Sequence, residues 1–256
     1  MRGMLKLVAG AAVAALATSG VLADTPKSGS TLTYAVTAEA PTYDCHTTTT
    51  YAAIHTLAPH YSLLLKVDQD NYPQLKPDIA ESWTVSADRL TYTFKLRANV
   101  RFHDGTPLTS RDVKASFDRI RNPPAGVISI RQALFEGIAS IEAPDPTTVV
   151  FKLKAVDGSF LDSVGLPYNC IYSAARIEKD ATFPAKNVMG SGPFVFVEHR
   201  PGSHWVGKKF ENYWDKGKPY LDGFKAVFIK SSAVVNALQG GQIQAEFRSI
   251  SPGERV

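Results

Sequence analysis

The 256-residue sequence lacks a strong excess of charge and, beyond its first residues, any long hydrophobic run. Its 28 basic and 24 acidic residues nearly balance, which argues against a nucleic acid or a membrane surface as the partner. No run after residue 23 is long and apolar enough for a transmembrane helix. With 44% hydrophobic and 20% charged residues, the composition is instead that of an ordinary globular protein with one large or two small domains.

Motifs of catalytic, metal and nucleotide sites are also missing. The six histidines show no HxxxH or HxH spacing, and there is no CxxC pair, so a metal site is not expected. The stretch NVMGSGPF lacks both the phosphate-loop and the dinucleotide-binding glycine patterns, and Ser191 within it lacks a nucleophile elbow. The sequence therefore predicts no catalytic residue, no metal and no cofactor.

The first 23 residues have the pattern of a secretory signal peptide. Arg2 and Lys6 precede the apolar run LVAGAAVAALA, and the segment ends in the small-x-small pattern of residues 21–23. Because the apolar run is too short to span a bilayer, we predict export and cleavage after Ala23. Removing two basic residues leaves 26 basic against 24 acidic ones, a mature charge of +2.

Cysteine is scarce, with only Cys45 and Cys170 in the whole chain. In an oxidising compartment, two cysteines of an exported chain are expected to form one disulfide. Such a bond would close a loop of 125 residues and stabilise the fold by about 4 kcal/mol. The alternative is a pair of buried thiols.

Periodicity predicts an alternation of strands and helices. Residues 31–37 favour a strand, a loop follows to residue 50, and a helix from Tyr51 is kinked or restarted near Pro59. Further strands are predicted at 81–86, 91–97, 147–154, 169–173, 191–199, 204–210, 224–230 and 243–247, and helices at 110–121, 174–180 and 233–241. The final strand, helix and strand form a βαβ-like unit, which implies a partly parallel sheet.

The adjacent pair His103-Asp104 resembles a catalytic or metal-binding pair, but the residues around it favour a structural role. Asp104-Gly105 is a turn dipeptide. Thr109 stands at a helix N-cap position with Asp112 three residues later, as in a capping box. We therefore predict a turn that leads into a capped helix.

That helix, residues 110–121, is predicted to be amphipathic. Val113, Phe117 and Ile120 fall on one stripe, which we expect to be buried. Arg119 and Arg121 fall near the negative end of the helix dipole, where a positive charge is favourable.

One long segment carries a family resemblance. Residues 78–120, DIAESWTVSADRLTYTFKLRANVRFHDGTPLTSRDVKASFDRI, closely resemble the signature segment of the family 5 extracellular solute-binding proteins of ABC transporters, the dipeptide, oligopeptide and nickel group. The stretches PTYDCHTTTTY, NVMGSGPFVFVEHRPG, NYWDKGKPYLDGFKAVFI and VVNALQGGQIQAEF also resemble family motifs. The resemblance extends from about residue 30 to 248.

The resemblance implies an α/β fold, that of a type II, cluster C-like periplasmic binding protein. Residues 24–50 and 186–256 would form its first lobe, and residues 51–185 an inserted subdomain. Because family members are about twice as long, the second lobe is expected to be missing. A solute held by one wall stays largely hydrated, so we expect weak or no solute binding and a partly exposed apolar hinge surface.

The same resemblance implies the function: a periplasmic component that delivers a peptide or similar small polar solute to ABC permease subunits, monomeric when full length. The expected solute contacts are Tyr43, Asp44, His46, Thr47, Thr48, Thr49, Thr50, Tyr51, Tyr168, Asn169 and Ser191. Each has an alternative, since Asp44 can cap the loop, Tyr168 can belong to the core and the threonines can be solvated. Two alternative functions are a non-transporting fragment or interaction module of an interrupted gene, and a periplasmic hydrolase.

Overall fold

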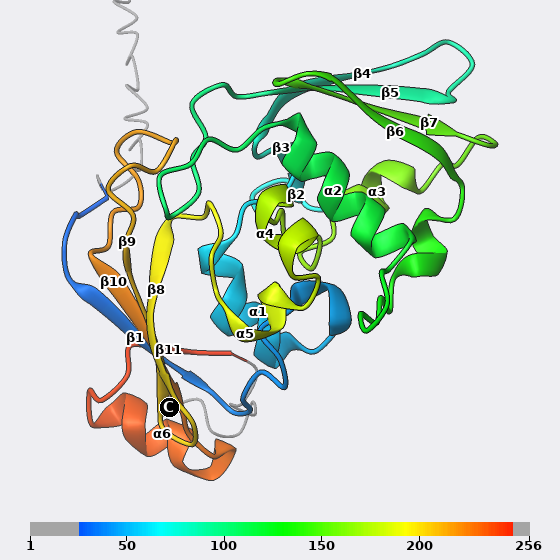
Figure 1. Ribbon diagram of the computed structural model, residues 1–256. Coiled ribbons are helices and arrows are strands. Elements are labelled where there is room, and N and C mark those ends of the chain that lie inside the picture. Colours follow the sequence, from blue (N-terminus) through cyan, green and yellow to red (C-terminus); the bar gives the residue numbers. More distant parts are fainter. Residues whose placement is uncertain (1–25, 248–256) are drawn as a thin grey trace, which may run out of the picture.

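The computed structural model describes residues 26–247, and the expected signal peptide lies outside the described residues (Figure 1). A five-stranded sheet has the order β11-β1-β10-β9-β8. Its strands are β1 (Thr31–Val36), β8 (Phe194–Arg200), β9 (His204–Lys209), β10 (Gly223–Phe228) and β11 (Ala245–Glu246). β1 pairs in parallel with both β10 and β11, whereas β9 is antiparallel to β10 and to β8.

The parallel part of this sheet arises from the predicted βαβ unit. Helix α6 (Ser231–Gln239) connects β10 to β11, and β1 lies between those two strands. Val234 and Ala237 of α6 pack with Ala35 and Ile243 in a small core at one face of the sheet. The expectation of a partly parallel sheet is therefore confirmed.

A second, antiparallel sheet has the order β4-β5-β7-β6. Its strands are β4 (Ala80–Val85), β5 (Thr91–Leu96), β6 (Ile138–Asp145) and β7 (Thr148–Leu153), and β2 (Leu65–Val67) pairs separately with β3 (Leu75–Pro77). Helix α2 (Ser110–Arg121), which has the predicted bounds, buries Val113, Phe117 and Ile120. The Phe117 ring packs edge-on against Phe135 and Phe151, so the predicted stripe is the contact with this sheet.

The remaining helices are α1 (Tyr51–Leu57), α3 (Phe160–Val164), α4 (Ala174–Lys179) and α5 (Phe183–Lys186). In the view of Figure 1, α1, α4 and α5 lie between the two main sheets. The larger hydrophobic core surrounds the four-stranded sheet, and a second core lies on the five-stranded sheet. The predicted division into a lobe of residues 24–50 and 186–256 and an insertion of residues 51–185 stays a prediction.

The turn before α2 has the predicted structural role. The Asp104 carboxylate accepts a hydrogen bond from the Thr106 amide at 3.0 Å, and His103 Nε2 lies 3.0 Å from the Gly192 carbonyl. At the start of α2, the Asp112 carboxylate accepts from the Thr109 amide at 2.7 Å, as a capping box requires. These polar side chains therefore serve the backbone.

The observed elements differ from the predicted ones in several places. Residues 169–173 form no strand, because the Ile171 and Tyr172 amides bond to the Ser62 carbonyl and the Ser116 hydroxyl instead of to a ladder. The helix from Tyr51 ends at Leu57 and is followed by a 3-10 turn, Ala58–His60, that contains Pro59, so the predicted break near Pro59 is confirmed. The apolar residues after it form β2 instead of more helix. Strand β6 was not predicted, because Pro144 and a register shift interrupt its alternation.

Candidate functional site

The carboxyl ends of the three parallel strands meet at one edge of the five-stranded sheet. In open α/β sheets, ligands bind outside this edge. The loop of residues 37–50 leaves the carboxyl end of β1, and Phe247 follows the carboxyl end of β11. Most of the predicted solute contacts lie in or beside that loop, so its geometry decides which of them face solvent.

The middle of the loop is fixed by a buried polar network, the Asp44 cluster of Asp44, His46, Arg119 and Tyr172. Arg119, from α2, donates to both Asp44 oxygens, with Nη2 at 2.5 Å from Oδ2 and Nη1 at 3.2 Å from Oδ1. The Tyr172 hydroxyl donates to Asp44 Oδ1 at 3.0 Å. Because every charged or polar group in the cluster has a partner, the loop can bury an ion pair.

Electrostatics in the cluster follow from this burial. Burial alone would raise the pKa of Asp44, but the bonded Arg119 guanidinium and the hydrogen bond from the His46 backbone amide hold the pKa of that carboxyl below its usual value. Burial lowers the pKa of His46 to about 3, so the ring is neutral at neutral pH. Its Nδ1 lies 2.9 Å from Arg119 Nη1 and its Nε2 lies 3.0 Å from the Cys170 carbonyl. A neutral ring that accepts at Nδ1 and donates at Nε2 fits both contacts.

A second arginine holds the end of the loop. Arg131 donates to the Thr48 carbonyl at 2.9 Å and to the Cys45 carbonyl at 2.7 Å. Its guanidinium carbon lies 5.0 Å from the centre of the Tyr168 ring. The Tyr168 hydroxyl in turn donates to the Thr49 carbonyl. Two arginines distant in sequence therefore fix the backbone of residues 44–49.

The two cysteines are joined in a disulfide within this region. Cys45 and Cys170 have a Cα–Cα separation of 6.1 Å, and both are buried. The bond connects the loop after β1 to the segment before α4, next to the Asp44 cluster. It is thus a covalent part of the same attachment.

Burial divides the predicted solute contacts into two groups. Asp44, His46, Thr48, Asn169 and Ser191 are buried, and Tyr43, Thr47, Thr49, Thr50, Tyr51 and Tyr168 are wholly or partly exposed. Asp44 and His46 are fully engaged inside the protein. The side-chain oxygen of Asn169 and the Ser191 hydroxyl are buried and have no hydrogen-bond partner among the described residues. Which of the predicted residues contact a solute stays a prediction.

The exposed group includes an aromatic surface, the Tyr51 face, made of Tyr51, His55, Tyr168 and Phe247. The side chain of Tyr51 is 58% exposed and that of Phe247 is 42% exposed. The His55 ring stacks on Phe247 with a centroid distance of 4.3 Å, and the Tyr51 ring lies 6.1 Å from His55. Burial and the neighbouring Tyr51 raise the pKa of the Tyr168 hydroxyl. Together these rings offer an apolar surface with polar edges.

Tyr43 lies apart from this face. Its ring packs edge-on against Trp205, and its hydroxyl lies 2.7 Å from His199 Nδ1. His199 Nε2 lies 3.0 Å from the Glu39 carboxylate, whose other oxygen accepts from the Gly202 amide. Tyr43 therefore fastens the beginning of the loop to the β8–β9 hairpin.

Ser191 belongs to a tight contact between the 3-10 turn at residues 58–60 and the start of β8. The Ser62 hydroxyl donates to the Ser191 carbonyl at 3.0 Å. A side chain at Gly192 would place its Cβ 2.6 Å from the His60 carbonyl carbon, so only glycine fits there. The glycines in NVMGSGPF allow close packing of two backbones.

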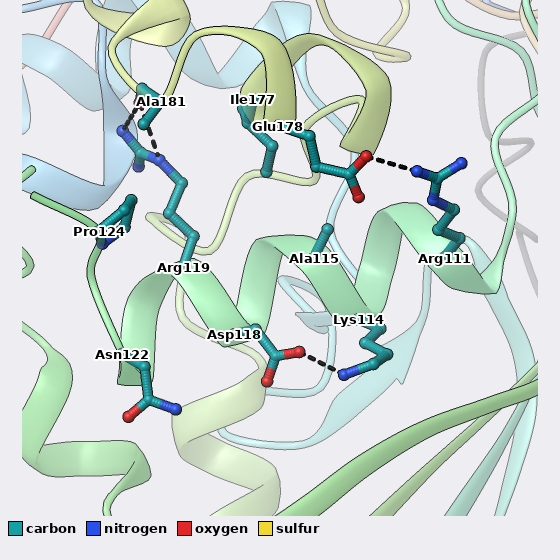
Figure 2. A pocket seen from close by; sticks show the side chains of 10 residues that line it. All are labelled: Arg111, Lys114, Ala115, Asp118, Arg119, Asn122, Pro124, Ile177, Glu178 and Ala181. Carbon is teal, nitrogen blue, oxygen red and sulfur yellow. Dashed lines mark hydrogen bonds and ion pairs between the residues drawn. The ribbon is translucent and has the colours of Figure 1, made fainter.

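A groove of about 590 Å³ lies between α2 and α4 (Figure 2). Ala115 and Ile177 face it, and it is flanked by the ion pairs Arg111–Glu178 and Lys114–Asp118. Arg119 lies at its other end, where it also donates to the Ala181 carbonyl. Because the charges along this groove are already paired with one another, it shows no preference for a ligand charge.

Other features of the described residues bear on chemistry and location. Within residues 26–247, no three histidine, cysteine or acidic side chains gather as a metal site would require. None of the helices in that range has the length and apolar character needed to cross a bilayer.

Sequence reasoning missed several residues that shape the site. Arg119, Arg131 and Tyr172 were not identified as partners of the loop, and His55 and Phe247 were not identified as exposed rings. No local pattern marks such partners, because Arg119 is 75 residues from Asp44 in sequence. The signal available was Phe247 itself, an aromatic residue at the end of the predicted strand 243–247 of the parallel unit.

Comparison with known proteins gives one family. Residues 74–254 match the model of the bacterial extracellular solute-binding proteins, family 5. The glutathione-binding protein GsiB of Escherichia coli is 38% identical over 153 residues, which are 60% of this chain and 30% of that protein.

Solved structures agree with this match. The periplasmic binding protein AgaA from A. tumefaciens, in complex with agropinic acid, has a TM-score of 0.78 and 34% identity over 83% of this chain. The periplasmic binding protein DppA from Helicobacter pylori, in complex with the peptide STSA, has a TM-score of 0.75 and 28% identity over 85% of this chain. The chain spans 43% and 46% of those two chains and about a third of the length of the curated relative.

Proposed function

Because the chain belongs to the family 5 bacterial extracellular solute-binding proteins, we propose that it acts as a solute-binding component of an ABC importer. Its fold is the α/β fold of periplasmic binding proteins. The partners in this proposal are a peptide or similar small polar solute and the membrane subunits of an ABC permease. The place of action is the periplasm, and the whole protein works as a monomer.

The observation that carries the proposal is the Tyr51 face at the carboxyl edge of the parallel strands. It is exposed and aromatic, and the loop beside it is held by the Asp44 cluster and the disulfide. A rigid scaffold that presents side chains on loops is how many proteins position binding residues. The rings of Tyr51 and Tyr168 suit the apolar parts of a peptide or similar solute.

The solute class follows from the relatives and from the face. The similar proteins bind glutathione, agropinic acid and a peptide, as their names state. A face of aromatic rings with hydroxyl edges suits a small solute with both apolar and polar groups. Because the face is open, a solute on it remains partly hydrated, and we expect binding by this chain to be weak.

A substitution tests the face directly. Tyr51→Ala removes the most exposed ring of the face, and we expect it to weaken binding of glutathione or a tetrapeptide about tenfold. Tyr72→Ala is the matched control, because Tyr72 is 81% exposed and lies between β2 and β3, away from the face. Titrations followed by nuclear magnetic resonance would measure both. Equal affinities of the two variants would contradict the assignment of the site.

A further inference from the structure

We propose that a cationic cavity beside the β2–β3 hairpin, distinct from the Tyr51 face, binds a phosphate group or a similar small oxyanion. The cavity has a volume of about 540 Å³. It forms where the hairpin, the end of β5 and residues 214–218 meet. Its lining consists of Lys66, Val67, Gln69, Lys76, Pro77, Arg97, Trp214, Asp215 and Lys218. Four of these side chains are cationic and one is acidic.

The placement of the acidic partners makes the inside of the cavity positive. Lys66 pairs with Asp78 at 3.1 Å and Lys76 pairs with Asp68 at 2.8 Å, but neither aspartate lines the cavity. Asp215, the acidic residue in the lining, is engaged by Lys218 at 2.9 Å. The lysines therefore present positive charge to the cavity from one side while their carboxylates lie outside its lining. With four cationic side chains and one acidic side chain, the lining has a net positive charge, and a cleft of net positive charge raises the local concentration of anions.

Arg97 is the cationic residue of the cavity without an acidic partner among the described residues. Its Nε donates to the Asp78 carbonyl at 2.9 Å, and its guanidinium carbon lies 4.5 Å from the centre of the Trp214 ring. Among the described residues, no carboxylate pairs with this guanidinium, and its two terminal nitrogens have no hydrogen-bond partner. The stacked ring and the single bond at Nε orient the planar fork. Such a fork matches the two oxygens of a phosphate or carboxylate.

Trp214, whose ring lies under the Arg97 guanidinium, has one unpaired donor of its own. The Trp214 indole Nε1 is buried and has no hydrogen-bond partner among the described residues. A buried donor without a partner is rare in native structures and calls for a ligand, a water or an ion. Because this nitrogen is buried and does not open onto the cavity, it adds no donor for an oxyanion there, and the proposal rests on Arg97 and the lysines.

The ligand class is a phosphate group, because several flexible ammonium groups around one arginine fork suit a compact group with more than one negative charge. The same chemistry is available from free phosphate and from the headgroup of an anionic lipid. The two sources differ because binding to a lipid headgroup attaches the protein to a vesicle, whereas binding to free phosphate leaves it in solution. An experiment with both probes therefore separates them.

The test uses the purified full chain, titrated with inorganic phosphate at constant ionic strength and followed by calorimetry. We expect saturable binding that is weakened about tenfold in Arg97→Gln. Arg200→Gln is the matched control, because it removes the same charge from an exposed side chain on the β8–β9 hairpin and should leave binding unchanged. If Arg97→Gln does not fold, the double variant Lys76→Gln with Lys218→Gln takes its place and should show the same loss.

A second arm of the test measures sedimentation of the chain with vesicles of phosphatidylglycerol and with vesicles of phosphatidylcholine. Binding of free phosphate alone supports a soluble ligand, and Arg97-dependent binding to phosphatidylglycerol vesicles supports a lipid headgroup. Absence of saturable binding to either probe would overturn the proposal. Binding that is equally strong in Arg97→Gln and in Arg200→Gln would overturn it as well.

Discussion

Two buried histidines make the stability of this fold depend on pH. Burial lowers the pKa of both His46 and His60 to about 3. In the unfolded chain a histidine titrates near pH 6.5. Between about pH 6.5 and 3 these histidines are protonated in the unfolded chain but not in the folded protein. The free energy of unfolding therefore falls as the pH falls from about 6.5 toward 3. Each histidine is expected to contribute a slope of up to about 1.4 kcal/mol per pH unit.

Urea unfolding at a series of pH values measures this slope. His60→Gln is the informative variant, because a glutamine can still donate to the Phe194 carbonyl and accept from Trp205 Nε1, as His60 does. It should reduce the slope of unfolding free energy against pH by the contribution of one histidine and leave the unfolding free energy at pH 8 nearly unchanged. A slope equal to that of the unchanged chain would contradict the assignment of a neutral buried ring.

The buried ion pair of Asp44 and Arg119 gives a second prediction at this scale. Arg119→Ala leaves the buried Asp44 carboxylate without its cation, which should cost about 3–5 kcal/mol of unfolding free energy. Arg121→Ala, two residues later in the same helix, removes a more exposed arginine and should cost less than about 1 kcal/mol. Urea unfolding measures both variants. Similar losses of unfolding free energy in the two would contradict the prediction that breaking the buried Asp44–Arg119 pair is the more costly change.

Sequence reasoning succeeded for local polar residues and failed for long-range ones. The functions of Asp104 and Asp112 were predicted correctly, because a turn and a helix cap are completed by residues a few positions away. Arg119 was interpreted through the helix dipole, whereas its main partner is Asp44, on a loop distant in sequence. Asp44 itself was proposed as a solute contact, and burial gives it a different partner in this structure.

At the scale of elements, the disulfide attaches the loop after β1 to the segment that precedes α4. It closes a loop with a sequence separation of 125 residues. Replacing both cysteines by alanine should lower the unfolding free energy by about 4 kcal/mol, because the unfolded chain regains that loop's freedom. A titration of the unfolded protein should find no free thiol before reduction and two afterwards. A variant as stable as the unchanged chain would contradict a structural role for the bond.

Elements whose apolar residues recur with a clear helix or strand period were predictable, and elements without such a period were not. Helix α2 combines a cap, an apolar stripe and a basic end, and its predicted bounds match the structure. Residues 169–173 contain Ile171 and Tyr172, which favour a strand, but the amides of these two residues bond to the Ser62 carbonyl and the Ser116 hydroxyl instead of to another strand. That competition depends on tertiary packing and leaves no trace in the local sequence.

At the scale of the whole molecule, two sheets with separate cores are connected through the loop after β1. The Asp44 cluster and the disulfide bring Arg119 and Cys170 to this loop, while Tyr43 attaches it to the β8–β9 hairpin. The loop is thus held from both sides. The Tyr51 face lies beside the loop, and one of its members, Tyr168, contacts the loop through its hydrogen bond to the Thr49 carbonyl.

The family was predictable from the sequence because a long segment, residues 78–120, carries its motifs, and the family match over residues 74–254 confirms it. The exposed rings were not predictable from that segment. Phe247 and His55 come from a strand end and from a helix far apart in sequence, and only the parallel pairing of β1 with β11 brings them together. Neither the solute nor the domain division follows from the motifs.

The most direct test of the account is a nuclear magnetic resonance titration of the chain with glutathione and with a tetrapeptide. We predict shifts concentrated at Tyr51, His55, Tyr168 and Phe247, with dissociation constants in the millimolar range or weaker, on the order of 4 kcal/mol of binding free energy at most. The buried Asp44 cluster should shift little. Shifts centred elsewhere, no shifts at the highest soluble concentrations, or submillimolar affinity would contradict the proposal that this open face is where the solute binds.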